Sequence, residues 1–242
     1  MALSLRDATF AVVDVETTGV DPAVDRVVEV ACVLMRIDRE LDTFSTLIDP
    51  GRPIPAIASA IHHITDRHVR GAPSLAEVQP QIDARCAGSI VVAHNARFDL
   101  GFLPFLAHRP MLCSMRLAMR VLPDAPNFKN QVLRYHLDVD ATLNEGAIAH
   151  RALGDAQVTG RILSILLQRH LAAGGTDDAE QLVREVAAPR RLAALPFGRH
   201  RGVAIESVPA DYLRWLDRES LSASRDARFT ARRELERRAM AS

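Results

Sequence analysis

The sequence predicts an α/β protein in which helices flank a central mixed sheet, with a smaller unit at the C-terminal end. Short apolar strand-like runs come first along the chain, helical patterns that alternate with further strands follow, and the last part is rich in arginine. Strands followed by alternating helices and strands are typical of a mixed α/β sheet. With 242 residues, 48% of them hydrophobic, the chain can bury the core of one good-sized domain and a small appendage.

Five strands are expected. Three apolar runs precede a proline-rich break, and the short links between them predict antiparallel neighbours: residues 9–15, 26–37 and 41–48. After the break, at residues 49–55, a fourth strand is predicted over 89–93 and a short fifth one near Met111.

The longest helix of this part is expected over residues 152–170, where recurring isoleucines and leucines supply an apolar face. Glycines at 174 and 175 interrupt the pattern, and Pro189 with the arginines after it marks a boundary. We therefore expect a main domain over residues 1–172, a linker or connecting helix over 173–189 and a small basic module over 190–242.

Charge is unevenly distributed along the chain, although the formal net charge is zero. Residues 1–187 hold 18 basic and 23 acidic side chains, and residues 188–242 hold 12 and 7. An acidic part joined to a basic tail fits a carboxylate-rich metal site beside a phosphate-attracting surface. On charge alone, two ordinary solvated faces are the simpler interpretation.

The cysteines and the N-terminal segment bear on the compartment. Three widely spaced cysteines without a CxxC pair argue against a disulfide framework and a zinc knuckle, so buried thiols are expected at Cys32, Cys86 and Cys113. No apolar run is long enough for a signal peptide or a membrane span, which predicts a cytoplasmic protein without a membrane partner.

Asp14 and Glu16 stand two residues apart at the end of the first predicted strand. Their side chains therefore point to the same face of the sheet, and those of Val13 and Val15 to the other. Two adjacent carboxylates repel each other unless a cation or a shared proton offsets the repulsion, and oxygen-only ligands suit Mg²⁺ or Mn²⁺ better than Zn²⁺. The dipeptide spacing alone equally describes two exposed acids.

Two further polar clusters follow predicted elements. HNARFD begins a helix after the fourth strand, with Asn95 as the predicted cap and Asp99 one turn into the helix. In HRALGD, His150 and Asp155 are five residues apart, a rotation of about 140° on a helix, so one helical face cannot present both. We expect His150 on the loop before the helix.

Together the three segments DVETTG, HNARFD and HRALGDA resemble the motifs of the DEDDh 3′–5′ exonucleases, the superfamily of the bacterial proofreading subunit, oligoribonuclease and ribonuclease T. Each segment alone is weak, but their order and spacing are specific. The resemblance covers about residues 8–171 and implies a ribonuclease H-like fold with a central mixed five-stranded sheet. The segment IHHIT resembles the family's loop between the first two motifs, where the family often has glycine in place of His63.

The resemblance also implies the chemistry of the site. Two divalent cations, Mg²⁺ or Mn²⁺, would be held by Asp14, Glu16, Asp99 and Asp155, and His150 would be the general base. A pair of cations can activate a water and stabilise the leaving oxygen in phosphodiester hydrolysis, and histidine can accept the proton near neutral pH. The family's substrate-binding segments correspond here to Thr17, Thr18, His62, Asn95 and Phe98. Core packing is an equal alternative for Phe98, and ordering of the turn before Gly19 for the two threonines.

The basic tail contains LPFGRHRG, VPADYLRWL and an arginine-rich helical segment that ends near Arg238. It resembles a small bacterial module with an FGKxKG-like turn and a PxDYLxW segment, whose function is poorly defined. The arginines and aromatics of these segments could contact phosphates and stack on bases. The favoured alternative makes Phe197, Tyr212, Leu213 and Trp215 the core of a very small domain.

The expected function is 3′–5′ exonuclease activity on single-stranded nucleic acid, DNA of a repair or proofreading type or, as the alternative, RNA. The expected partners are 3′ ends of single-stranded DNA or RNA, and a DNA polymerase or a replication or repair assembly. A non-catalytic binding module is disfavoured because all four carboxylates and the histidine are present, and no Walker loop or GxGxxG follows a strand.

Overall fold

The computed structural model describes residues 3–139, 150–220 and 223–240. The chain divides into two compact units, residues 1–187 and 188–242, and each is described by itself.

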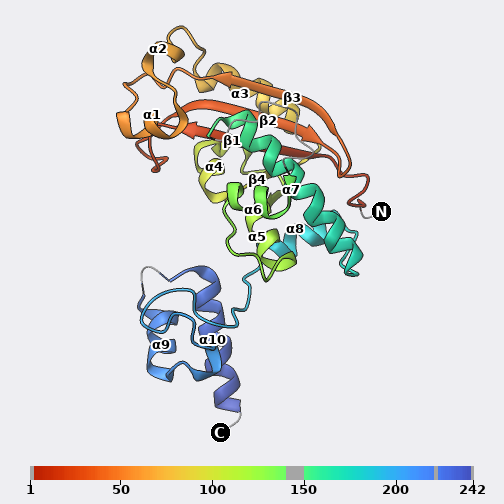
Figure 1. The fold of residues 1–242 in the computed structure, drawn as a ribbon, viewed down its shortest axis with the longest axis vertical. Helices are drawn as coiled ribbons and strands as arrows, with labels where there is room; N and C mark the ends of the chain where they lie inside the picture. Colours follow the sequence, from red (N-terminus) through yellow and green to blue (C-terminus); the bar gives the residue numbers. More distant parts are fainter. Residues whose placement is uncertain (1–2, 140–149, 221–222, 241–242) are drawn as a thin grey trace. The chain divides into compact units, whose positions relative to one another are not determined.

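The first unit is built on a five-stranded mixed sheet (Figure 1). The strands lie in the order β3-β2-β1-β4-β5. The long strands β1 to β3 pair antiparallel, whereas β4 pairs parallel with β1 and β5 parallel with β4. The bounds are β1 (Phe10–Thr17), β2 (Val27–Met35), β3 (Glu40–Leu47), β4 (Ile90–Ala93) and β5 (Met111–Cys113). The predicted α/β class, the five strands and the antiparallel neighbours are confirmed.

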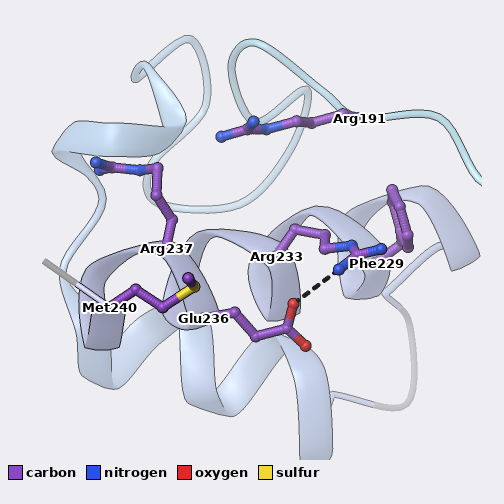
Figure 2. A pocket seen from close by; sticks show the side chains of 6 residues that line it. All are labelled: Arg191, Phe229, Arg233, Glu236, Arg237 and Met240. Carbon is purple, nitrogen blue, oxygen red and sulfur yellow. Dashed lines mark hydrogen bonds and ion pairs between the residues drawn. The ribbon is translucent and has the colours of Figure 1, made fainter.

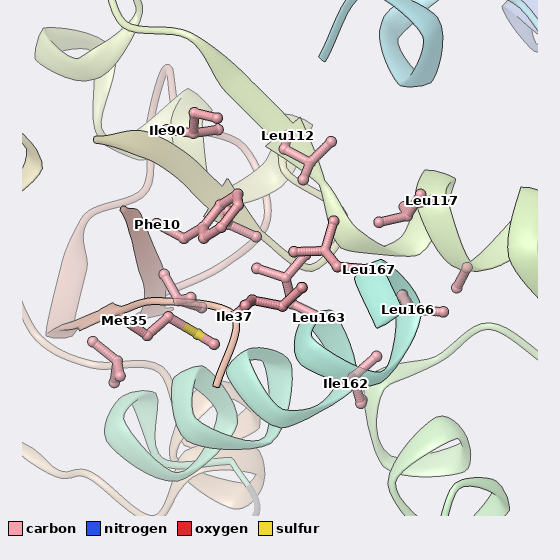
Figure 3. Packing of buried hydrophobic residues seen from close by; sticks show 14 of the residues in the cluster. Phe10, Met35, Ile37, Ile90, Leu112, Leu117, Ile162, Leu163, Leu166 and Leu167 are labelled. Carbon is pink, nitrogen blue, oxygen red and sulfur yellow. The ribbon is translucent and has the colours of Figure 1, made fainter. Parts of the chain in front are cut away.

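Helices cover both faces of this sheet because alternate strand residues supply an apolar layer on each side. One layer includes Phe10 and Val12 of β1 and packs against α7 (Ala152–Ala172), as Figure 3 shows. The same layer takes side chains from α5 (Ser114–Val121), α6 (Asn130–His136) and α8 (Ala179–Ala187). The helix α7 lies close to the sheet at Gly160, where an added Cβ would meet the Met35 sulfur at 3.0 Å.

The opposite layer includes Ala11, Val13 and Val15 of β1. It is covered by three short elements: α3 (Leu75–Cys86), α4 (Arg97–Phe102) and η1 (Pro104–Leu106). Two of the cysteines, Cys32 and Cys86, are buried in this layer, and Cys113 is half-buried at its margin.

A small cluster at one end of β2 holds α1 (Ala56–His62) and α2 (Asp66–Val69). His63 ends α1 in the left-handed conformation, with φ of 60°. Glycine adopts this conformation without steric cost, which explains why a glycine suits this place in the loop.

The segment expected as a linker or connecting helix contains α8. Its buried residues Ala179, Leu182 and Val186 belong to the same apolar layer as α7, so α8 is part of the first unit.

The second unit consists of η3 (Ile205–Ser207), α9 (Ala210–Arg218) and α10 (Arg225–Met240). Tyr212 and Leu213 are buried in its core and Phe197 packs against them, as expected. The expectation for Trp215 is wrong: this residue is 38% exposed and is not part of the buried cluster, although its ring lies beside that of Tyr212 at 5.2 Å between centroids. On a helix the positions 212, 213, 215 and 216 span an arc of about 160°, and Trp215 lies at one edge of that arc.

Among the described helices none combines the length and the apolar composition that a membrane span requires.

Candidate active site

Three carboxylates from two distant parts of the chain meet at the end of β1. Oxygen atoms of Asp14, Glu16 and Asp155 all lie within 4.8 Å of one another. Asp14 and Glu16 project from the same face of β1, as the alternation predicts, while Val13 and Val15 enter the opposite apolar layer. Asp155 reaches them from the first turn of α7.

Asp99 lies buried beside this trio, in the first turn of α4, and is only 3% exposed. Its charge acts on Asp14 and Glu16 strongly enough to raise the pKa of both. The structure therefore brings all four predicted carboxylates into one electrostatic neighbourhood, although Asp99 stands outside the closest group.

Burial and mutual repulsion make these acids hard to ionise. Burial, followed by the charges of Asp155 and Glu29, raises the pKa of Glu16 to about 8. Burial raises the pKa of Asp99 to about 7 and raises that of Asp155, and the pKa of Asp14 lies well above its usual range for the same reason. A site whose charges oppose one another in this way gains most from a bound cation.

The start of α7 is fixed by an ion pair between a buried acid, Glu29, and a partly exposed arginine, Arg151. Glu29, on β2 opposite Glu16, is 3% exposed and accepts hydrogen bonds from Arg151 Nε at 3.0 Å and Nη2 at 2.6 Å. The same carboxylate accepts the backbone N–H of Ala152 at 2.9 Å, which satisfies a free donor in the first turn of α7. This pairing holds the helix that carries Asp155 against the strand pair that carries Asp14 and Glu16.

His150 lies on the loop before α7, as expected, with φ of 60°. Its backbone N–H donates to Asp155 Oδ2 at 2.9 Å, and its residue is exposed. The other carboxylate oxygen, Asp155 Oδ1, accepts from the Gln131 side-chain amide of α6 at 2.5 Å. Both Asp155 oxygens are thus oriented by donors, and the histidine is tied to the carboxylate cluster through its main chain.

Thr17 and Thr18 order the turn after β1. Thr17 Oγ1 donates to the Gly19 carbonyl, and Thr18 Oγ1 donates to Asp25 at 3.1 Å and accepts from the Arg26 N–H at 3.0 Å. These bonds correspond to the turn-ordering alternative. They leave the substrate-binding role of the two threonines untested.

His62 is 2% exposed at the end of α1. Its Nδ1 accepts the backbone N–H of Ile64 at 3.0 Å, while its buried Nε2 makes no hydrogen bond of good geometry within the described part of the chain, although the Thr17 backbone lies close enough to act on the pKa of the ring. Burial lowers the pKa of this ring, so its neutral form is favoured. A buried polar atom without a hydrogen bond of good geometry is rare in folded proteins, and a substrate group is one candidate to supply that bond.

The predicted cap of α4 is wrong. Ala96 occupies the capping position, and Asn95 precedes it, exposed and left-handed with φ of 63°. Asparagine tolerates this conformation better than most residues, so the residue shapes the turn between β4 and α4. Phe98 is half-buried and packs beside Phe102 at 5.2 Å between centroids, which agrees with the core-packing alternative.

Two residues that organise the site escaped the sequence interpretation: Glu29 and Gln131. An acid within the apolar run of β2 was a usable signal for Glu29, since a lone charge in a buried strand requires a partner. Gln131 gave no such signal, because its partner lies 24 residues further along the chain.

The chain matches known exonucleases over most of its first unit. The sequence model of the RNase_T family, described as exonuclease, matches residues 11–163. The chain belongs to this exonuclease family. Within it, the residues at Asp14, Glu16, Asp99, His150 and Asp155 make the chain a DEDDh-type exonuclease.

Similar proteins agree with this membership. DNA polymerase III PolC-type of Streptococcus thermophilus is 33% identical over 187 residues, which cover 76% of this chain and 13% of that protein. The corresponding protein of Oceanobacillus iheyensis is 34% identical over 174 residues, or 69% of this chain and 12% of that one. The chain thus spans only about an eighth of the length of these relatives.

Solved structures share the fold. The structure of Exonuclease X in complex with 5′ overhanging duplex DNA is 30% identical in sequence and has a TM-score of 0.60. The match covers 72% of the present chain and 99% of the Exonuclease X chain. Escherichia coli Exonuclease I in complex with a dT13 oligonucleotide has a TM-score of 0.56 at 17% identity, and covers 69% of this chain and 42% of its own. The ribonuclease H-like fold expected from the motifs is confirmed.

The carboxylate cluster also fits the divalent cations that this family generally uses. The trio offers only carboxylate oxygens as ligands, and the donors of Gln131 and His150 hold the Asp155 carboxylate in a fixed orientation. Hard cations such as Mg²⁺ and Mn²⁺ prefer such oxygen sets.

Proposed function

We propose that the chain is a 3′–5′ exonuclease that hydrolyses the terminal phosphodiester of single-stranded DNA. The observation that carries the proposal is the meeting of Asp14, Glu16 and Asp155 within 4.8 Å, with Asp99 buried beside them. The repulsion among four clustered acids is offset when cations bind, and bound cations also attract a polyanionic substrate.

The four carboxylates would hold two divalent cations. When bound, such cations supply Lewis-acid stabilisation of the charge that develops on phosphate oxygens, and lower the pKa of water. The hydrogen bonds from Gln131 and from the His150 main chain keep Asp155 aimed at the cluster.

His150 would act as the general base. Its side chain is exposed while its N–H is fixed to Asp155, so the ring can turn toward an attacking water without losing that anchor. General bases contribute roughly 10²–10⁴-fold to rate, and His150→Ala should cost that much in turnover.

The substrate pocket would be formed by the end of β1 with the turn after it, the end of α1, and the turn from β4 into α4. Thr17, Thr18, His62, Asn95 and Phe98 are the residues assigned to it. His62 is buried beside the Thr17 backbone, which supports the placing of both residues in one wall of the pocket. DNA is favoured because the similar structure at 30% identity was solved with duplex DNA carrying an overhang, and because the PolC-type relatives are DNA polymerases.

The test uses matched 3′-labelled and 5′-labelled single-stranded DNA and RNA oligonucleotides, with Mg²⁺, Mn²⁺ or EDTA. The wild type should shorten DNA stepwise from the 3′ end and stop in EDTA. His150→Ala should lose most of the activity, and the matched variant His108→Ala, at another exposed histidine, should keep it.

Faster digestion of RNA than of DNA would overturn the DNA assignment and favour an RNA-trimming enzyme. Equal activities of the His150 and His108 variants would overturn the general-base role. If no oligonucleotide is cut with either metal, the chain is a binding module instead.

A further inference from the structure

The second unit carries a hollow lined by six residues, three of which are arginines (Figure 2). Arg233 and Arg237 reach it from α10, and Arg191 reaches it from the segment that enters the unit. Phe229 and Met240 add an apolar rim. The three arginine side chains remain 53–59% exposed, so their charges face solvent.

These guanidinium groups are held in place by buried structure. Glu234 is fully buried and pairs with Arg237 at 2.7 Å, Arg238 at 2.9 Å and Arg191 at 3.3 Å. The arginines hold the pKa of Glu234 at about 2, so it stays ionised. One buried acid therefore fixes three cations, and two of them line the hollow.

Arg233 is fixed separately. Its guanidinium lies 5.5 Å from the centroid of the Phe229 ring and pairs with Glu236 at 3.1 Å. Of the six residues that line the hollow, three are arginines and one is acidic, so the hollow itself has a positive charge. The whole of residues 188–242 carries 12 arginines against 7 acids, whereas residues 1–187 carry an excess of acids.

This charge separation matters because the acidic nuclease unit repels the polyanionic strand that it is proposed to bind. A polyanion that approaches four clustered carboxylates meets unfavourable potential until cations are bound, and fixed arginines elsewhere on the chain can supply the affinity. Arginine forks match phosphate oxygens in pairs, and an aromatic ring offers a face for a base.

We propose that the hollow lined by Arg191, Phe229, Arg233 and Arg237 binds the sugar–phosphate backbone of single-stranded nucleic acid. The biological role of this second binding site rests on the proposed function, since the site would hold the strand that the carboxylate site shortens. Its affinity is independent of metal and of catalysis.

The test measures binding of a fluorescent 20-nucleotide single strand to the full chain in EDTA, where no hydrolysis occurs, over a range of salt concentrations. The double variant Arg191→Gln/Arg233→Gln should bind about tenfold more weakly, since two exposed charge contacts together are worth about one decade. Its plot of log affinity against log salt should be shallower by roughly 0.7 for each phosphate of the single strand that an arginine no longer neutralises.

The matched control is Arg232→Gln. Arg232 neighbours Arg233 on α10 and is equally exposed, but it pairs with Asp217 of α9 and does not line the hollow. Arg233→Gln should weaken binding and Arg232→Gln should not. Equal effects of the two would overturn the proposal, because they would show a response to net charge alone.

Competition and a small substrate separate the remaining outcomes. Poly-glutamate that displaces the oligonucleotide as well as unlabelled DNA does would overturn the proposal in favour of a general acidic partner. The double variant should hydrolyse the p-nitrophenyl ester of thymidine monophosphate at the wild-type rate. If the wild type cuts neither this ester nor DNA but still binds through the arginines, the proposed function fails and the binding site stands.

Discussion

Glu16→Gln should make the metal-free protein more stable. Burial and neighbouring acids raise the pKa of Glu16 from 4.5 to about 8, so the folded protein holds a proton that the unfolded chain releases between these values. Stability falls with rising pH wherever the folded state binds more protons. The metal-free wild type should therefore lose stability from about pH 4.5 to about pH 8.

The size of this loss follows from the shift. Each pH unit corresponds to about 1.4 kcal/mol, so the roughly 2.5 units between the ordinary pKa of Glu16 and pH 7 set an upper limit of about 3.5 kcal/mol. Glu16 is half-buried, and water screens part of the effect. We expect Glu16→Gln to gain about 1–2 kcal/mol at pH 7 in EDTA, and to flatten the pH dependence.

The assay is urea denaturation in EDTA from pH 5 to 9, repeated with saturating Mg²⁺. The cation should stabilise the wild type, by about 3 kcal/mol at a hundred times its dissociation constant, and the variant by less. Glu77→Gln is a control of opposite sign, because hydrogen bonds from the Ser74 side chain and main chain lower the pKa of Glu77. Its loss of stability should be present above pH 4.5 and vanish as the pH falls below the folded pKa. A wild type and a Glu16 variant with identical pH profiles in EDTA would refute the reasoning.

Three further changes test the surroundings of the site. Arg151→Met leaves the Ala152 N–H as the remaining hydrogen-bond donor to the buried Glu29 among the described residues, and should lower the free energy of unfolding by about 2–3 kcal/mol. The control is Arg184→Met, whose ion pair with Glu180 is largely exposed, and an equal loss there would contradict this. His63→Gly should raise the melting temperature by relieving the left-handed conformation, a gain of about 1 kcal/mol that His63→Ala should not reproduce. Asp14→Ala should abolish metal-dependent hydrolysis and leave the circular dichroism spectrum of the folded protein unchanged; retained activity would remove Asp14 from the site.

Local periodicity predicted what depends on neighbouring residues. The alternation along β1 placed Asp14 and Glu16 on one face, and the helical offset placed His150 before α7. Periodicity could not bring Asp155 to Asp14, because that contact depends on α7 folding back across the sheet. The resemblance of the three motifs supplied this long-range information.

The misses have physical causes of the same kind. Asn95 was assigned the cap from its residue type, but the chain leaves β4 through a left-handed turn and the helix begins one residue later. Trp215 was assigned to the core together with the other aromatic residues, but it lies at the edge of the apolar face of α9 and remains 38% exposed. Both errors come from assigning a role by residue type alone, without knowing the local backbone conformation or the direction in which the side chain points.

The opposition of charges explains why the site needs so many supporting contacts. Four acids in one neighbourhood favour an arrangement that spreads them apart, and α7 and α4 would be free to move if only the acids held them. The Glu29 pair with Arg151 ties α7 to β2, and Gln131 ties Asp155 to α6. On the far side, the ring of His94 links Ser114 and the Phe128 carbonyl, at 2.9 and 2.7 Å, and fixes the end of β4 before Asp99. The scaffold thus holds the carboxylates in place before any cation binds. The free energy of binding the cation and the strand is therefore not reduced by a need to order these side chains.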